Sequence, residues 1–251
     1  MTSLTIAVIV AALMFVSGGI GLILQKLLAE HHTSDRSRDM IGGVVGLVTL
    51  LLALVLGLLI WTAYGVFNTQ QGELQTLCAK ALEFDLEMRQ YGPQANDARG
   101  LLRTDLVWAH EQFWGSDETA GQAYAASYAN MDSLNAFLGG LQPSTDLQRQ
   151  MLGDARRNYG FIGEYRLLMS LQLTNPISWP LIIAVTAWSC LLFFGLGMLS
   201  RVNATTLAAL ALGACAVASA IFLILEFSQP YSSSIRISPA GLEEVIVDLD
   251  K

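Results

Sequence analysis

Four long stretches of this 251-residue chain contain no charged side chain. Each is longer than the roughly 20 apolar residues that an α-helix needs to cross a hydrocarbon core about 30 Å thick. A charge at the centre of such a helix costs about 3 kcal/mol, so gaps of this length are typical of membrane spans. The stretches are Met1–Gln25, Met40–Gly72, Leu167–Ser200 and Val202–Leu225. They predict an all-α integral membrane protein with transmembrane helices near residues 4–25, 41–68, 177–199 and 203–227.

The composition excludes several classes of function. Hydrophobic residues make up 53% of the chain, and its formal net charge is −7. This balance argues against nucleic-acid binding, which needs clustered Lys and Arg to neutralise phosphates. The three cysteines, Cys78, Cys190 and Cys215, form no CxxC pair. Because clustered His, Cys or paired acids are also missing, we expect no enzyme, no cofactor and no metal site.

The segment between the second and third apolar stretches carries most of the charge. Apolar residues recur in it at steps of three and four, beginning with Leu74, Leu77, Ala81, Phe84 and Met88. Such stripes predict at least three amphipathic helices between residues 73 and 174. We therefore divide the chain into transmembrane helices 1 and 2 (1–72), a water-facing helical domain (73–174), transmembrane helices 3 and 4 (175–230) and a tail with a short helix (231–251).

An even number of spans places both termini on the side that also holds the inserted domain. The positive-inside rule compares Lys and Arg near the spans on the two sides. One side offers Lys26, Arg36, Arg38 and Arg201, and the other offers Lys80, Arg156, Arg157, Arg166 and Arg236. The counts nearly balance, so charge alone does not decide the orientation.

Three features together give the chain a resemblance to a known family. They are the glycine-spaced second span (Gly42-Gly43-x-x-Gly46), the helical insert, and a tail that runs from Glu226 through Pro230-Tyr231 to Pro239. The chain resembles the bacterial bestrophin-like family, named for similarity to bestrophin anion channels. Ser233 departs from the glycine that we expect in relatives. The resemblance implies a homopentamer in the bacterial inner membrane, a second span that lines an anion-conducting pore, and a cytoplasmic domain and termini.

The second span carries a stripe of small residues, for which two interpretations stay open. Small residues let helices pack closely in lipid, and this interpretation assigns helix packing to Gly42, Gly46 and Gly57. Alternatively, the helix lines a narrow pore, because side chains at these steps share one helix face. The pore-lining candidates are then Thr49, Ala53, Ile60, Tyr64 and Asn68. The two interpretations are compatible if the helices pack around a central axis.

Two further groups of residues carry weaker hypotheses. Glu226 lies at the end of the fourth span, and ionisable residues within spans often handle ions or protons. It could equally reach water or pair with Arg236. The histidines His31 and His32 stand beside Glu30, but zinc needs a third convergent ligand, so a solvated loop is the better interpretation.

Two functions of different classes therefore compete. The first is an oligomeric ion channel that binds inorganic ions and sits in the lipid bilayer, with anions favoured by the resemblance. The second is a membrane-anchored helical sensor or scaffold without transport activity. The acidic charge of the inserted domain argues against anion selectivity of such a channel, because rings of Asp and Glu favour cations. Against the second, the tail after the last span is short.

Overall fold

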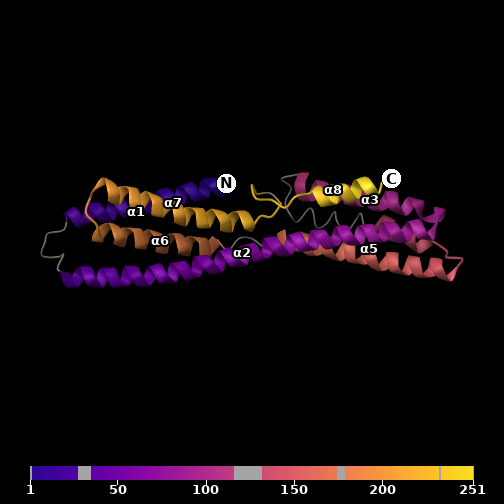
Figure 1. The fold of residues 1–251 in the computed structure, drawn as a ribbon, viewed down its shortest axis with the longest axis horizontal. Coiled ribbons are helices and arrows are strands. Elements are labelled where there is room, and N and C mark those ends of the chain that lie inside the picture. The colour runs from indigo at the N-terminus through magenta and orange to yellow at the C-terminus, as the bar shows by residue number, and fades with distance from the viewer. Residues whose placement is uncertain (1, 28–34, 116–131, 174–178, 232, 251) are drawn as a thin grey trace. The chain divides into compact units, whose positions relative to one another are not determined.

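The computed structural model describes residues 2–27, 35–115, 132–173, 179–231 and 233–250. Every regular element within these ranges is helical, as the sequence predicts. The elements in chain order are α1 (Ser3–Leu27), α2 (Asp35–Tyr91), a 3₁₀ turn η2 (Pro93–Ala95), α3 (Asn96–His110), a π-helical turn η3 (Glu111–Gly115), a helical stretch at 132–140, α5 (Asp146–Leu173), α6 (Trp179–Leu199), α7 (Ala204–Phe227) and α8 (Ala240–Asp248) (Figure 1).

The helix α2 is much longer than predicted. The sequence suggested a span that ends near residue 68, but α2 runs without a break from Asp35 to Tyr91, which is 57 residues in all. Gly65 and Gly72 do not interrupt it, because a glycine keeps its backbone N–H and costs a helix only about 1 kcal/mol relative to alanine. The helix ends at Tyr91, where Gly92 adopts a φ of 113° and Pro93 follows. A side chain would be strained at that φ, so glycine is the residue that fits this turn.

Internal contacts divide the chain into two units. We call Met1–Val66 with Ile177–Ser228 the membrane unit, and Phe67–Pro176 with Gln229–Lys251 the helical unit. The helix α2 contributes its first part to one unit and its last part to the other. The water-facing character of the inserted segment stays a prediction.

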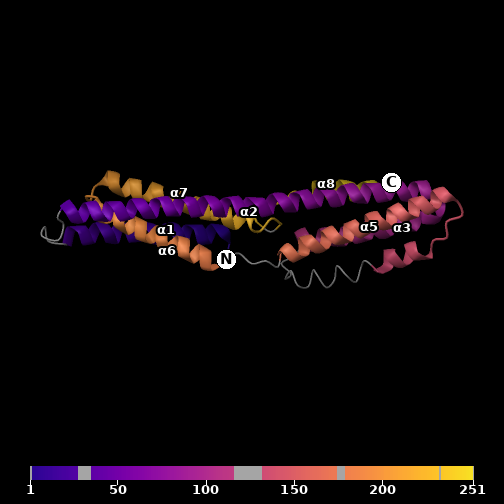
Figure 2. The same cartoon turned by 90° about the horizontal axis from the view of Figure 1, so that it is seen from below.

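The membrane unit contains the four helices that are long and apolar enough to cross a membrane: α1, the first part of α2, α6 and α7. Both views of the fold show them running side by side (Figures 1 and 2). Within the unit α1 packs against both α6 and α7, whereas α6 and α7 contact each other little. The shared core is apolar and includes Met14, Leu22, Val185 and Ile221.

The helical unit has a second core, formed by the last part of α2 with α3 and α5. Fully buried side chains at its centre include Phe84, Leu102, Leu106 and Ile162. The helix α8 adds Leu242 and Val245 to this core and packs against α3, and Leu249, directly after α8, also joins the core. The sequence predicted a short helix in the tail, and the structure has α8 there. Within the predicted domain at 73–174, residues 116–131 lie outside the described residues.

Candidate functional site

The predicted pore-lining residues lie on one side of α2. Within a single chain, Thr49, Ala53 and Tyr64 are exposed, and so is Asn68 in the helical unit. Ile60 differs, since it is half-buried and packs against the core of its own membrane unit. The side of α2 that faces this core carries Leu52, Leu56 and Ala63 instead.

Two of the predicted pore-lining side chains, those of Thr49 and Tyr64, make contacts within the chain. The hydroxyl of Thr49 donates a 2.8 Å hydrogen bond to the carbonyl oxygen of Val45, one helical turn earlier. Its proton is therefore used within α2, and its oxygen stays available as an acceptor. The ring of Tyr64 lies edge-on to that of Phe227 on α7, with centroids 5.6 Å apart. This contact positions the bulkiest candidate of the predicted stripe.

A second exposed surface of α2 consists of large apolar side chains. Leu50 and Leu54 are about three-quarters exposed, and Trp61 is 73% exposed. A membrane-spanning helix can leave such groups in lipid or cover them with another copy of the chain. At Gly42, Gly46 and Gly57 an added Cβ would meet no atom within 4 Å. Their assignment to helix packing stays a prediction, and no contact among the described residues of the chain supports it.

Close glycine packing in the membrane unit occurs between α1 and α6, and Gly195 of α6 also lies against Val45 of α2. A Cβ at Gly21 would lie 2.2 Å from the carbonyl oxygen of Phe194, and one at Gly197 would lie 2.2 Å from that of Gly18. Ser17 adds a 2.7 Å hydrogen bond to the carbonyl oxygen of Cys190. Sequence reasoning missed this contact, although Gly18, Gly21 and Gly197 all lie in apolar stretches.

Glu226 is buried at 2% exposure in the last turn of α7. An acidic side chain in the interior of a membrane unit is costly and is often functional. Its proposed role in ion or proton handling stays a prediction. Glu30, His31 and His32 lie outside the described residues.

The helical unit contains a buried ion pair that the sequence did not reveal. Nη1 of Arg166 on α5 lies 2.5 Å from Oδ2 of Asp105 on α3, and the hydroxyl of Tyr159 donates to the same oxygen at 3.3 Å. The guanidinium also lies over the ring of Trp108, 5.4 Å from its centroid. Burial raises the pKa of Asp105, while Arg166 and the hydrogen bonds oppose the rise. Burial also raises the pKa of Tyr159.

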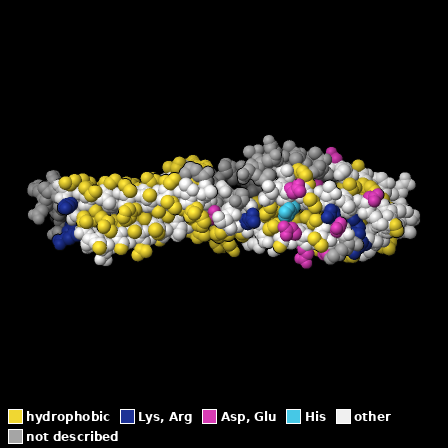
Figure 3. Space-filling model, turned by 90° about the horizontal axis from the view of Figure 1, so that it is seen from above, with side chains coloured by type: hydrophobic (Ala, Val, Ile, Leu, Met, Phe, Trp, Pro, Cys, Tyr) yellow, Lys and Arg dark blue, Asp and Glu magenta, His cyan; other side chains and the backbone are white. Residues whose placement is uncertain are grey.

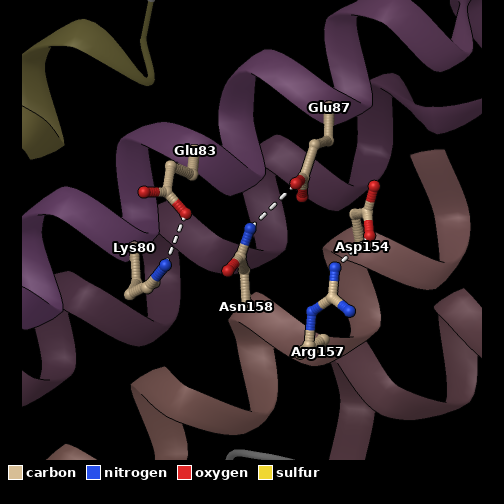
Figure 4. Close-up of polar contacts among 6 residues, drawn as sticks. All are labelled: Lys80, Glu83, Glu87, Asp154, Arg157 and Asn158. Atoms are coloured by element: carbon tan, nitrogen blue, oxygen red, sulfur yellow. Dashed lines mark hydrogen bonds and ion pairs between the residues drawn. The ribbon is translucent and has the colours of Figure 1, made fainter.

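Polar contacts between α2 and α5 lie nearer the surface of the helical unit (Figure 4). Asn158 donates a 2.8 Å hydrogen bond to Glu87 and so joins the two helices. Lys80 pairs with Glu83 within α2, and Arg157 pairs with Asp154 within α5. These groups interact as ion pairs and hydrogen bonds, and the described residues contain no group of three His, Cys, Asp or Glu side chains placed to hold a metal.

The segment after α7 is fixed to the helical unit by hydrogen bonds and aromatic packing. The hydroxyl of Tyr231 donates a 2.6 Å hydrogen bond to Gln70 on α2, and Nε1 of Trp114 donates one of 2.9 Å to the carbonyl oxygen of Ile237. The ring of Tyr231 also packs edge-on against Trp114. Burial raises the pKa of Tyr231, and the charge of Glu73 adds to the rise, so the hydroxyl remains a donor.

These observations agree with a comparison against protein families. The model of the bestrophin-like domain matches residues 10–242, which is most of the chain. The chain belongs to the bestrophin-like family. With four apolar helices of spanning length, it is a membrane protein.

Solved structures show that this bestrophin-like chain has a known fold. A point mutant of a bacterial bestrophin homolog from Klebsiella pneumoniae aligns with a TM-score of 0.73 at 13% identity, covering 96% of this chain and 97% of that one. Another crystal structure of that homolog, phased with zinc, gives 0.72 at 14% identity and 96% of each chain. A crystal structure described only as a membrane protein gives 0.73 at 13% identity and 97% of each. No curated protein matches the chain.

The tail that carried the resemblance is also a structural feature of this bestrophin-like protein. Pro230 and Tyr231 are both buried, and the carbonyl oxygen of Pro230 accepts a 2.8 Å hydrogen bond from the N–H of Ile237. Ser233, where we expected glycine, has no positive φ, since Gly92 is the residue with that conformation among those described. The departure at this position therefore introduces no backbone strain.

Proposed function

We propose that several copies of this chain assemble around an axis and form a channel for inorganic ions, with α2 lining the pore. The observation that carries the proposal is the exposed side of α2. Of the four apolar helices, α2 is the one least buried within its own chain. In a ring of chains this side of α2 would be enclosed around the pore, because cyclic symmetry brings the same helix of each copy to the central axis.

The chemistry of the exposed stripe supports a narrow pore. Thr49 and Ala53 are small, and the helix backbone can approach an axis closely where side chains are small. Tyr64 is larger and is held against Phe227, which makes it the candidate for the constriction. Apolar or aromatic constrictions can gate by excluding water. Asn68 would add a polar group one turn beyond it.

The conducted ion is an anion in this proposal, as the family resemblance implies, and the assembly is a pentamer. The stripe itself contains no charged residue, so it supplies no ring of Asp or Glu that would favour cations. We further propose that the protein sits in the bacterial inner membrane, with the helical unit and both termini in the cytoplasm.

The decisive experiment measures flux and assembly in the same preparation. Purified protein is weighed by native mass spectrometry, then inserted into vesicles that carry a chloride gradient. The proposal expects a closed ring of chains and a current whose reversal potential shifts with the chloride gradient. A closed ring whose current reverses at a potential set by the sodium gradient would show that the conducted ion is a cation. A monomer without flux would instead favour the sensor or scaffold.

A further inference from the structure

A groove in the membrane unit lies between α6 and α7, beside the turn that joins them. It has a volume of about 330 Å³, which is near the lower end for small-molecule sites. The groove forms because both helices pack on α1 and contact each other little. It is independent of the α2 surface on which the channel proposal rests.

The walls of the groove change character along its length. Its inner part is apolar and is lined by Phe193, Leu196 and Leu210. Its mouth is polar and is lined by Ser200, Thr205 and Thr206. From Thr205 to Gly213 the lining follows α7 for about 12 Å at 1.5 Å per residue. An occupant that fits both parts has an apolar chain and a polar head.

The mouth of the groove favours a negative charge. It adjoins the N-terminus of α7, where the helix dipole is positive. Asn203 of the groove lining caps this end by accepting a 2.6 Å hydrogen bond from the N–H of Thr206, and the N–H groups of the two preceding residues lack partners within the helix. Arg201 lies in the same turn and is exposed. Arg38 donates to the carbonyl oxygen of Leu199 at 3.4 Å, which keeps a second positive charge near the turn. Figure 3 shows basic side chains at this end of the membrane unit.

The side chains around the groove indicate which molecule fills it. Large apolar side chains on α6 and α7, such as Leu191 and Leu212, are more than 60% exposed, as expected for a surface in lipid. A groove that opens onto such a surface is filled by lipid unless protein covers it. We propose that this groove binds one anionic phospholipid, with an acyl chain between Phe193 and Leu210 and the phosphate beside Arg201 and the start of α7.

The test uses the full chain in mild detergent, with native mass spectrometry to count bound lipid. Dioleoyl phosphatidylglycerol is the anionic probe and dioleoyl phosphatidylcholine the zwitterionic one. Both lipids carry the phosphate, but the choline cation of phosphatidylcholine is repelled by Arg201. We therefore expect the anionic lipid to bind about tenfold more tightly. Arg201→Gln should remove this preference. Equal affinity for the two lipids in the wild type would overturn the proposal.

A matched pair of variants separates the groove from the rest of the surface. Ala209 lines the groove and Ala208 is its exposed neighbour outside it. Ala209→Phe should lower the affinity for phosphatidylglycerol at least tenfold, whereas Ala208→Phe should leave it within about twofold. The melting temperatures of both variants show whether each still folds.

Two other results would assign the groove to a different occupant. If Ala209→Phe changes the number of chains per particle, a second copy of the chain covers the groove and the lipid proposal is wrong. If inorganic phosphate alone displaces phosphatidylglycerol at millimolar concentration, the site binds a free anion and needs no acyl chain. Neither measurement depends on ion flux, so the channel proposal and the lipid proposal can fail separately.

Discussion

The hydroxyl of Tyr231 donates a 2.6 Å hydrogen bond to Oε1 of Gln70, and both side chains are buried. The bond joins the segment after α7 to α2 within the helical unit. Two residues that lie 161 positions apart in the sequence thus fix the start of the tail.

Replacing Gln70 tests this contact. Gln70→Leu leaves the buried Tyr231 hydroxyl without its acceptor, which costs about 1–3 kcal/mol. For a chain of this size the melting temperature should fall by several degrees, because each kcal/mol shifts it by about 2–4 °C. Differential scanning fluorimetry in detergent measures the shift. Gln71→Leu is the control, since Gln71 is exposed next to it. Equal shifts for the two variants would contradict the assigned role of the hydrogen bond.

The buried tyrosines predict loss of stability in alkali. The pKa values of Tyr159 and Tyr231 are raised in the folded protein by burial. An unfolded tyrosine ionises near pH 10, so above that pH the unfolded state loses protons that the folded state keeps. The contribution is complete below about pH 10 and falls as pH rises further. The double variant Tyr159→Phe with Tyr231→Phe should flatten the decline in melting temperature between pH 9 and pH 11, relative to its own value at pH 8. An unchanged slope would show that other groups control alkaline unfolding.

The buried ion pair of Asp105 with Arg166 predicts that a single substitution will strongly lower the stability of the protein. Arg166 is fully buried and cannot lose its proton, so Asp105→Asn leaves an uncompensated charge in the core. Breaking a buried pair in this way costs about 3–5 kcal/mol. Thermal unfolding should therefore occur well below that of the wild type. Arg157→Gln, which breaks an exposed pair on the same helix, should change little.

A second substitution distinguishes the ion pair from simple packing. The double variant Asp105→Asn with Arg166→Met removes both charges and should recover part of the lost stability, since an apolar replacement of a buried pair is often tolerated. If the double variant is less stable than Asp105→Asn alone, the charge of Arg166 is not the source of the damage.

The contact between α1 and α6 predicts that single methyl groups will disrupt the membrane unit. A Cβ at Gly21 would clash with the backbone of Phe194, and backbone atoms cannot move aside easily. Gly21→Ala should lower the melting temperature and the yield of folded protein. Gly19→Ala is the control, because a Cβ there meets nothing within 4 Å and alanine favours a helix by about 1 kcal/mol over glycine. The prediction is wrong if both variants behave alike.

The sequence predicts the number of apolar helices and their approximate ends because charge-free stretches report directly on burial in lipid. It also predicts a short helix in the tail, where the structure has α8. It does not predict that α2 runs through residue 68, because glycine weakens a helix without ending it. Gly92 with Pro93 is the stronger signal, and α2 does end there.

Contacts between distant residues were the part that sequence could not supply. The stripe of small residues in the second span includes Gly42, Gly46 and Gly57. The described glycines at which an added Cβ would clash are instead Gly21, Gly195 and Gly197. Small residues occur in both places, and only the partner helix decides which of them are crowded. Asp105 and Arg166 likewise lie 61 residues apart, and no spacing rule joins them.

The last prediction concerns the proposed constriction. Tyr64 is 47% exposed in the single chain and touches Phe227 at one edge of its ring. If α2 surrounds an axis, Tyr64→Ala removes the largest side chain of the stripe and widens the pore, so chloride flux into proteoliposomes should rise severalfold. Leu58→Ala shortens an exposed side chain on another side of α2 and should change flux little. Equal and unaltered flux in both variants would place the constriction elsewhere. If wild type and Tyr64→Ala both insert correctly and conduct no ions, the channel proposal is wrong and the sensor or scaffold function is favoured.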